Sequence, residues 1–233
     1  MTPLGRHSIT AAALALAATG GYLTARRTLT AQITAARHDA THDSLTGAYN
    51  RAGLTAAAPD LIAAAGRARR PVVVALVDLV GFKAVNDRHG HDAGDHILTT
   101  VAGRLAGIAG PAGIAARLGG DEFALVTTGP AARLADAERW LAGWLPHIHG
   151  RLTTPVTWHH GDPLAVGATI GATLATTDQP LSAWLTAADR AMYAARDQRT
   201  TTATAAPTIP PAVRRREMAR PTSRLATAYP RAA

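Results

Sequence analysis

The chain has 233 residues, of which 47% are hydrophobic but only 4% aromatic, and it contains no cysteine. This length allows one domain of ordinary size with appendages, and the missing cysteines exclude disulfides, thiolate metal sites and cysteine nucleophiles. The net charge of +8 would suit a nucleic-acid-binding protein, but residues 200–233 hold six arginines against one acidic residue and so carry most of it. We therefore expect a disordered basic tail at 200–233 and no nucleic-acid partner.

Residues 8–25 form an uncharged, Ala-rich stretch that is preceded by Arg6 and followed by Arg26 and Arg27. Its length is marginal for a helix that spans a bilayer, and its Ala, Thr and Gly content makes it weakly hydrophobic. A membrane anchor, a cleaved signal peptide and a soluble helix all fit this composition. We favour membrane association through residues 8–25, with 1–27 as the anchor segment. Because basic residues prefer the cytoplasmic side, the rest of the chain would then lie in the cytoplasm, at the inner face of the membrane.

The remaining chain alternates patterns typical of helices and strands. Residues 28–42 have apolar side chains at helical spacing, which predicts a linker helix. A continuous apolar run at 72–77 is typical of a strand covered on both faces. Two hairpins are expected at 114–117 with 123–127 and at 156–160 with 164–172, and helices at about 52–66, 92–106, 131–145 and 181–196. This order predicts an α+β fold with an antiparallel-rich sheet and helices on one face.

Three acidic residues stand at positions where strands are expected to end. Asp78 follows the buried strand, and Asp121 and Glu122 follow Gly119 and Gly120 on a hairpin turn. Carboxylates at strand ends can converge on a hard cation, and Mg²⁺ is commonly held by one or two carboxylates plus substrate phosphates. Taken singly, an Asp after a strand is more often a cap and a Gly-Gly turn an ordinary hairpin. A shared cation site requires Asp78 and Asp121 to lie close together.

Segments of the chain resemble, in order and spacing, the motifs of the GGDEF family: residues 43–51 (DSLTGAYNR), 78–87 (DLVGFKAVND), 90–95 (GHDAGD), 117–123 (RLGGDEF), 168–171 (ATIG) and 188–195 (ADRAMYAA). The likeness covers 43–199. It implies an α+β, palm-like (ferredoxin-like) antiparallel sheet flanked by helices, as in nucleotide cyclases. It also implies a diguanylate cyclase, which condenses two GTP into cyclic di-GMP and two pyrophosphates as a homodimer with Mg²⁺ or Mn²⁺.

The resemblance assigns roles to the acidic residues and to two residues between them. Asp78 and Asp121 would hold the metal, and Glu122 would help to deprotonate the attacking 3′-hydroxyl. Asn86 and Asp95 would read the guanine edge, since a carboxylate accepts from the N1–H and N2–H₂ donors that adenine lacks.

The resemblance also assigns a phosphate-binding set. Lys83 and the backbone of the turn at Phe82 would cradle the β- and γ-phosphates. Gly119 and Gly120 would allow the nucleotide to approach the main chain closely. Arg196 would take the place of a phosphate-binding lysine. None of the ten histidines is assigned to a metal.

Three departures from the family pattern qualify these roles. Val80 stands where many members carry a second Asp. Arg196 replaces the usual Lys, and the following Gly-Arg-Asn ending lacks its Gly, which leaves Arg199 as the second clamp. These changes predict a raised KM, and they leave a catalytically weak GTP-binding regulatory module as the alternative function. Gly110 and Gly113 occupy the positions of the Arg-x-x-Asp product-inhibition motif, so we expect no product-inhibition site.

Overall fold

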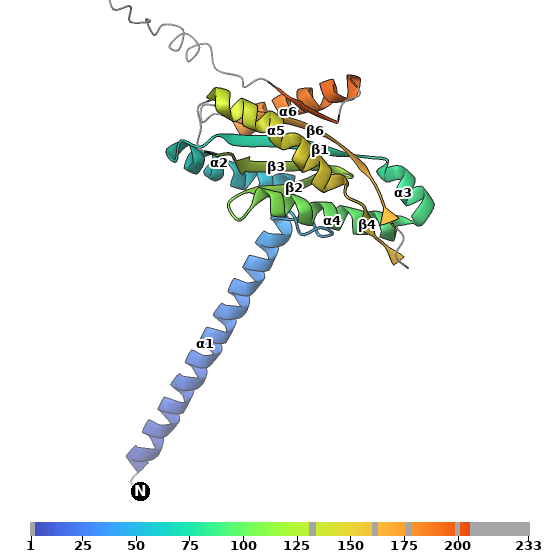
Figure 1. Cartoon of the computed structure of the whole chain (residues 1–233). Helices are drawn as coiled ribbons and strands as arrows, with labels where there is room; N and C mark the ends of the chain where they lie inside the picture. The colour runs from blue at the N-terminus through green and yellow to red at the C-terminus, as the bar shows by residue number, and fades with distance from the viewer. Residues whose placement is uncertain (1–2, 131–133, 160–162, 176–178, 199–200, 206–233) are drawn as a thin grey trace, which may run out of the picture.

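Strand β1 (Val72–Val80) lies at the centre of a five-stranded sheet with the order β2-β3-β1-β6-β7 (Figure 1). It pairs antiparallel with β3 (Glu122–Thr128) and with β6 (Gly167–Ala175). At the edges, β2 (Ile114–Gly119) is antiparallel to β3 and β7 (Thr202–Thr204) is parallel to β6. The computed structural model describes residues 3–130, 134–159, 163–175, 179–198 and 201–205. The predicted α+β palm-like fold is confirmed as a mixed sheet flanked by helices.

Helices cover both faces of the sheet. Helices α4 (His91–Ala109) and α5 (Leu134–Thr153) pack on one face, and α2 (Arg51–Arg67) and α6 (Leu181–Asp197) pack on the other. Alternate residues of β1 enter the two apolar cores, and all of residues 72–77 are buried. The expectation of helices on one face was wrong, because a strand that is apolar on both sides needs cover on both sides.

Two elements differ from the sequence-based expectation in the part of the fold next to the site. Helix α3 (Phe82–His89) follows β1 directly, where only a turn was expected, and it begins after Gly81, whose φ is +83°. The second predicted hairpin is present in a shorter form, because β4 (Val156–Thr157) and β5 (Pro163–Leu164) pair antiparallel as a separate two-stranded sheet. Most of the predicted second strand, 164–172, belongs instead to β6 of the main sheet, which pairs with β1 and β7.

The N-terminal and C-terminal parts of the chain also differ from the sequence-based expectation. The predicted anchor and linker form one continuous helix, α1 (Pro3–Thr41), which projects away from the sheet (Figure 1). None of the described helices combines the length and the apolarity needed to cross a membrane. The prediction of disorder from residue 200 is wrong for residues 201–205, which contain β7, and 206–233 lie outside the described residues.

Candidate functional site

Asp78 and the acidic residues of the hairpin lie on neighbouring strands. Asp78 on β1 is the Cα partner of Glu122 on β3, and the backbone N–H of Leu79 donates to the carbonyl of Asp121 at 3.3 Å. Register partners in an antiparallel pair present their side chains to the same face. This face is the one covered by α2 and α6, because the alternate β1 residues Val74 and Leu76 belong to that core. The main chain therefore brings the three predicted acidic residues together.

Arg196 lies in the last turn of α6 and forms an ion pair with Asp78 through Nη2 and Oδ2. The Asp78 side chain is 19% exposed and that of Arg196 is 45% exposed. The arginine predicted to bind phosphate thus contacts the aspartate predicted to bind metal. Beside them, a cavity of about 260 Å³ separates the hairpin from α6, with Glu122 and Met192 among its lining residues. Glu122 itself is exposed.

The hairpin tip, residues 119–122, depends on its glycines for its shape. Gly119 has φ +148° and Gly120 has φ +54°, values that other residues rarely adopt, and the β2–β3 register shifts between Arg117 and Gly119. Arg117 donates to the Gly120 carbonyl from Nε at 3.0 Å and from Nη2 at 2.8 Å. The tip that carries Asp121 is therefore tied to the strand that leads into it.

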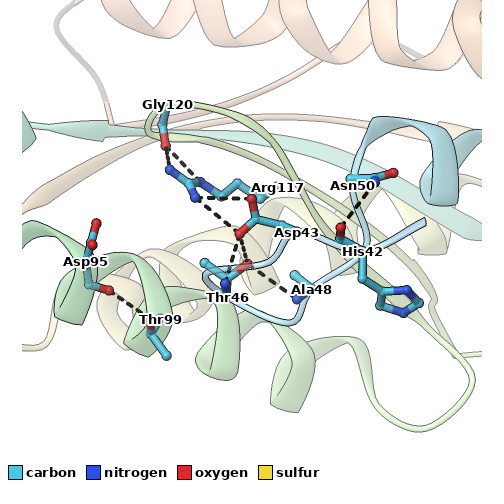
Figure 2. Close-up of polar contacts among 9 residues, drawn as sticks. All are labelled: His42, Asp43, Thr46, Ala48, Asn50, Asp95, Thr99, Arg117 and Gly120. Carbon is cyan, nitrogen blue, oxygen red and sulfur yellow. Dashed lines mark hydrogen bonds and ion pairs between the residues drawn. The ribbon is translucent and has the colours of Figure 1, made fainter. Parts of the chain in front are cut away.

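The Arg117 guanidinium also forms an ion pair with Asp43 (Figure 2). The arginine Nη1 donates to both carboxylate oxygens of Asp43 at 3.2 Å, and Asp43 also accepts from the Thr46 hydroxyl at 2.6 Å and the Thr46 N–H at 2.9 Å. Partial burial would raise the pKa of Asp43, but the Thr46 hydrogen bonds and Arg117 outweigh it, so the pKa lies below its ordinary value. Sequence reasoning gave Asp43 no role, although its motif was among the family-like segments.

The same loop connects the hairpin to helix α1. Asn50 caps α2 by accepting from the Gly53 N–H at 2.9 Å, and its Nδ2 donates to the carbonyls of Ala40 at 3.0 Å and His42 at 3.2 Å. Tyr49 bridges to β2, since its carbonyl accepts from the Arg117 N–H at 2.8 Å. The end of α1, the start of α2 and the base of the hairpin are thus joined within one loop.

The predicted guanine-binding residues lie on α3 and α4. A Cβ atom placed on Gly94 of α4 would lie 1.9 Å from Oδ1 of Asn86 and 3.2 Å from the ring of Phe82, so both side chains pack against this glycine. Asn86 Oδ1 is buried and has no hydrogen-bond partner among the described residues. The next residue on α4, Asp95, is exposed, and the Thr99 hydroxyl donates to its main-chain carbonyl rather than to its carboxylate (Figure 2).

Lys83 stands in the first turn of α3. Its ammonium pairs with Asp87 at 3.4 Å, and the two side chains are 89% and 63% exposed, so this contact is a weak surface pair. The predicted residues therefore form two groups: one at the hairpin and the end of α6, and one between α3 and α4. The turn at Gly81 joins the two groups.

The structure also places the residues that depart from the family pattern. Val80 is 51% exposed at the end of β1 and brings no carboxylate to the site. Gly110, with φ +72°, and Gly113 lie in the connection from α4 to β2, and a Cβ atom on Gly113 would come within 2.3 Å of the Ala109 carbonyl. Neither glycine has a side chain to bind a ligand, and Gly113 has no room for one without a shift of the main chain.

The chain has relatives among known proteins. The family described as "Diguanylate cyclase, GGDEF domain" matches residues 40–202. The diguanylate cyclase TpbB of Pseudomonas aeruginosa is 37% identical over 163 residues, which are 69% of this chain and 36% of TpbB. An uncharacterised 19.3 kDa protein of Streptomyces ambofaciens is 42% identical over 171 residues, covering 72% of this chain and 82% of that protein.

The coiled coil and GGDEF domain of DgcB from Caulobacter crescentus, solved with c-di-GMP, superimposes with a TM-score of 0.68 at 23% identity, covering 82% of this chain and 97% of that one. The chain spans only 19% and 36% of the lengths of two curated relatives that it matches, an uncharacterised signalling protein of Caulobacter vibrioides and TpbB. The matched region includes both groups of candidate residues, from Asp43 to Arg196. The chain therefore belongs to the diguanylate cyclase GGDEF domain family.

Proposed function

We propose that this chain is a diguanylate cyclase that joins two GTP molecules into cyclic di-GMP and releases two pyrophosphates. The observation that carries the proposal is the meeting of Asp78, Asp121 and Glu122 at the end of two central strands, beside a glycine hairpin. Family membership and the activity by which TpbB is named support the same reaction.

In this proposal, Asp78 and Asp121 hold a divalent cation, Mg²⁺ or Mn²⁺. The described residues contain no group of three or more His, Asp or Glu side chains that could hold a metal by themselves. Two carboxylates on adjacent strands still fit Mg²⁺, which commonly completes its shell with water and substrate phosphates. When bound, the cation would supply charge neutralisation for the α-phosphate and for the departing pyrophosphate.

The remaining residues bind the nucleotide and move a proton. Glu122 is exposed beside the cavity and accepts the proton of the attacking 3′-hydroxyl. Asn86 and Asp95 hydrogen-bond the guanine edge. The Oδ1 of Asn86 is suited to this role, because it is buried with no hydrogen-bond partner among the described residues and such an acceptor is costly. Lys83 and Arg196 bind the phosphates.

The reaction needs two copies of the domain. Each copy offers one guanine-binding pair and one set of carboxylates, while the product contains two guanosines joined by two phosphodiester bonds. Two domains that face one another, each with one GTP, place each 3′-hydroxyl against the α-phosphate held by the other. We therefore propose that the active form is a homodimer.

The experiment measures pyrophosphate and cyclic di-GMP formed by the purified full chain with GTP and Mg²⁺. Asp121→Ala and Glu122→Ala should each lower turnover by roughly a hundredfold or more. Glu138→Ala, which removes an exposed acid from α5, is the matched control and should leave turnover unchanged. Turnover that is insensitive to both hairpin variants would contradict the proposal.

The second candidate, a catalytically weak GTP-binding regulatory module, is favoured by Val80 and by the pairing of Arg196 with Asp78. It predicts binding of GTP by the wild-type chain with no turnover. The same assay, with calorimetric binding of GTP alongside, separates the two functions.

A further inference from the structure

The last turn of α6 places a positive charge on the carboxylate that the proposed function assigns to a metal ion. Arg196 contacts Oδ2 of Asp78, which is one of the two oxygens available to a cation. We infer that Arg196 is a placeholder cation: it keeps free divalent metal off Asp78, and it leaves Asp78 for the nucleotide phosphates when GTP arrives. This inference rests on the proposed function, because it takes Asp78 as the metal ligand and GTP as the nucleotide.

Asp78 needs a counter-charge when no nucleotide is bound. Its side chain is only 19% exposed, and its neighbours across the β1–β3 pair are the acidic residues Asp121 and Glu122. Like charges on paired strands repel one another, and the partial burial of Asp78 weakens the screening of this repulsion by water. A guanidinium on Asp78 offsets this repulsion, so the contact with Arg196 stabilises the cluster in the absence of ligand.

The helix that carries Arg196 is firmly seated, so the exchange must occur by movement of the side chain. A Cβ atom on Gly171 of β6 would lie 2.2 Å from the Ala188 carbonyl and 2.2 Å from the Met192 N–H, which shows that α6 rests directly on the strand. After the helix, the Thr201 carbonyl accepts from the Ile170 N–H at 2.9 Å, and β7 continues along β6. The Arg196 side chain, at 45% exposure, has solvent into which it can turn.

The competition follows from charge. A divalent cation on Oδ2 would repel the guanidinium strongly at the separation of a direct contact, so the two cannot share that oxygen. A triphosphate resolves the conflict because it offers Arg196 a bidentate partner of higher charge and brings its own metal ligands. By linkage, nucleotide must then raise the affinity for metal, and metal the affinity for nucleotide, by the same factor. A lysine at position 196 would compete with the metal less well, since an ammonium lacks the fixed planar arrangement of donors that a guanidinium offers to a carboxylate.

The test is Mn²⁺ binding to the full chain without nucleotide, measured by electron paramagnetic resonance and by calorimetry. We expect Arg196→Gln to bind Mn²⁺ roughly three- to tenfold more tightly than wild type, as befits a partly exposed ion pair, and Arg196→Lys to fall between them. Arg190→Gln removes the same charge from an exposed position on α6 and should change the affinity less than about twofold. Adding Mn²⁺ should also raise the Tm of Arg196→Gln more than that of wild type.

Two results would overturn the inference: equal Mn²⁺ affinity in wild type and Arg196→Gln, or a gain that persists when Asp78→Asn is added. Failure of every variant to bind Mn²⁺ would overturn it as well. GTP turnover by wild type, measured on the same preparation, tests the proposed function separately. Turnover with equal Mn²⁺ affinities refutes the placeholder alone, whereas a tighter Arg196→Gln with no turnover refutes the cyclase activity alone.

Discussion

The hairpin end of the site and the α3–α4 end are built in opposite ways. At the hairpin, Arg117 ties the Gly120 carbonyl to Asp43, and Asp78 is paired with Arg196 before any ligand binds. Between α3 and α4, the Oδ1 of Asn86 is buried without a partner among the described residues, and the Lys83 pair is a surface contact. These charged groups at the hairpin end therefore already have partners within the chain, whereas the buried Asn86 oxygen at the α3–α4 end has none among the described residues.

This difference predicts that changes at the hairpin will cost both stability and turnover, while changes at α3–α4 will mainly cost affinity for GTP. The two kinds of effect can be separated, because unfolding and nucleotide binding are measured independently. The variants below are chosen so that each has a control of the same chemical type elsewhere in the chain.

The largest effect is expected from Arg117→Met. The side chains of Arg117 and Asp43 are only 14% and 23% exposed, so removal of the guanidinium leaves the Asp43 carboxylate without its counter-charge and the Gly120 carbonyl without its arginine donor. We expect the free energy of unfolding to fall by roughly 2–3 kcal/mol. Turnover should fall at least about tenfold, because the hairpin carrying Asp121 is no longer held in place. Urea denaturation and pyrophosphate release measure the two effects.

The control for this variant is Arg139→Met on α5. Arg139 pairs with Asp136 at 3.3 Å, but their side chains are 80% and 51% exposed. Loss of such a surface pair should change the free energy of unfolding by no more than about 0.5 kcal/mol. An Arg117→Met protein as stable as Arg139→Met would show that the cross-link does not hold the hairpin.

An intermediate effect is expected from Gly94→Ala on α4. The new methyl group would meet Oδ1 of Asn86, which is the end of a side chain and can rotate away, so the free energy of unfolding should fall by no more than about 2 kcal/mol. The displaced amide would lose its position at the proposed guanine site. The Kd of a non-hydrolysable GTP analogue should rise roughly tenfold, since a polar group built for the base is no longer in place.

Gly103→Ala is the matched control on the same helix. Apart from its chain neighbours and the backbone of its own helix, no atom lies within 4 Å of a Cβ at this position, so alanine should stabilise α4 by up to about 1 kcal/mol and leave the Kd unchanged. Equal nucleotide affinity in the Gly94 and Gly103 variants would refute the role of Asn86 in binding the base.

The sequence predicted the hairpin end better than the rest of the site, for physical reasons. A continuous apolar run identifies β1, and paired glycines identify a hairpin, so both acidic strand ends could be placed from local patterns. Helix α3 was missed because it is short, follows a glycine, and buries only Val85, which leaves no apolar periodicity. Strand β7 was missed because its Thr and Ala residues are ordered by pairing with β6. The Asp43–Arg117 pair joins residues far apart in the chain, which no local pattern reveals.

The smallest effect concerns the pH dependence of stability through Asp43. Burial raises the pKa of this carboxyl, but the Thr46 hydroxyl, the Thr46 N–H and Arg117 together bring it below the ordinary value of 3.8. A carboxyl whose pKa is lower in the folded than in the unfolded state adds stability above its unfolded pKa, and this contribution is lost as the pH falls through the folded pKa. Asp43→Asn has no such titration. The difference in unfolding free energy between wild type and Asp43→Asn should therefore be constant from pH 7 to about pH 5 and should shrink below about pH 4.

Urea denaturation of both proteins between pH 3 and pH 7 measures that difference, and it cancels the acid unfolding that the two chains share. Asp136→Asn serves as the control, because the Asp136 carboxylate is exposed and its pair with Arg139 is a surface contact. A difference that stays the same at pH 3 and pH 7 would mean that the charge of Asp43 does not stabilise the hairpin. Arg117 would then hold the hairpin tip through its hydrogen bonds to the Gly120 carbonyl, and its ion pair with Asp43 would add no stability.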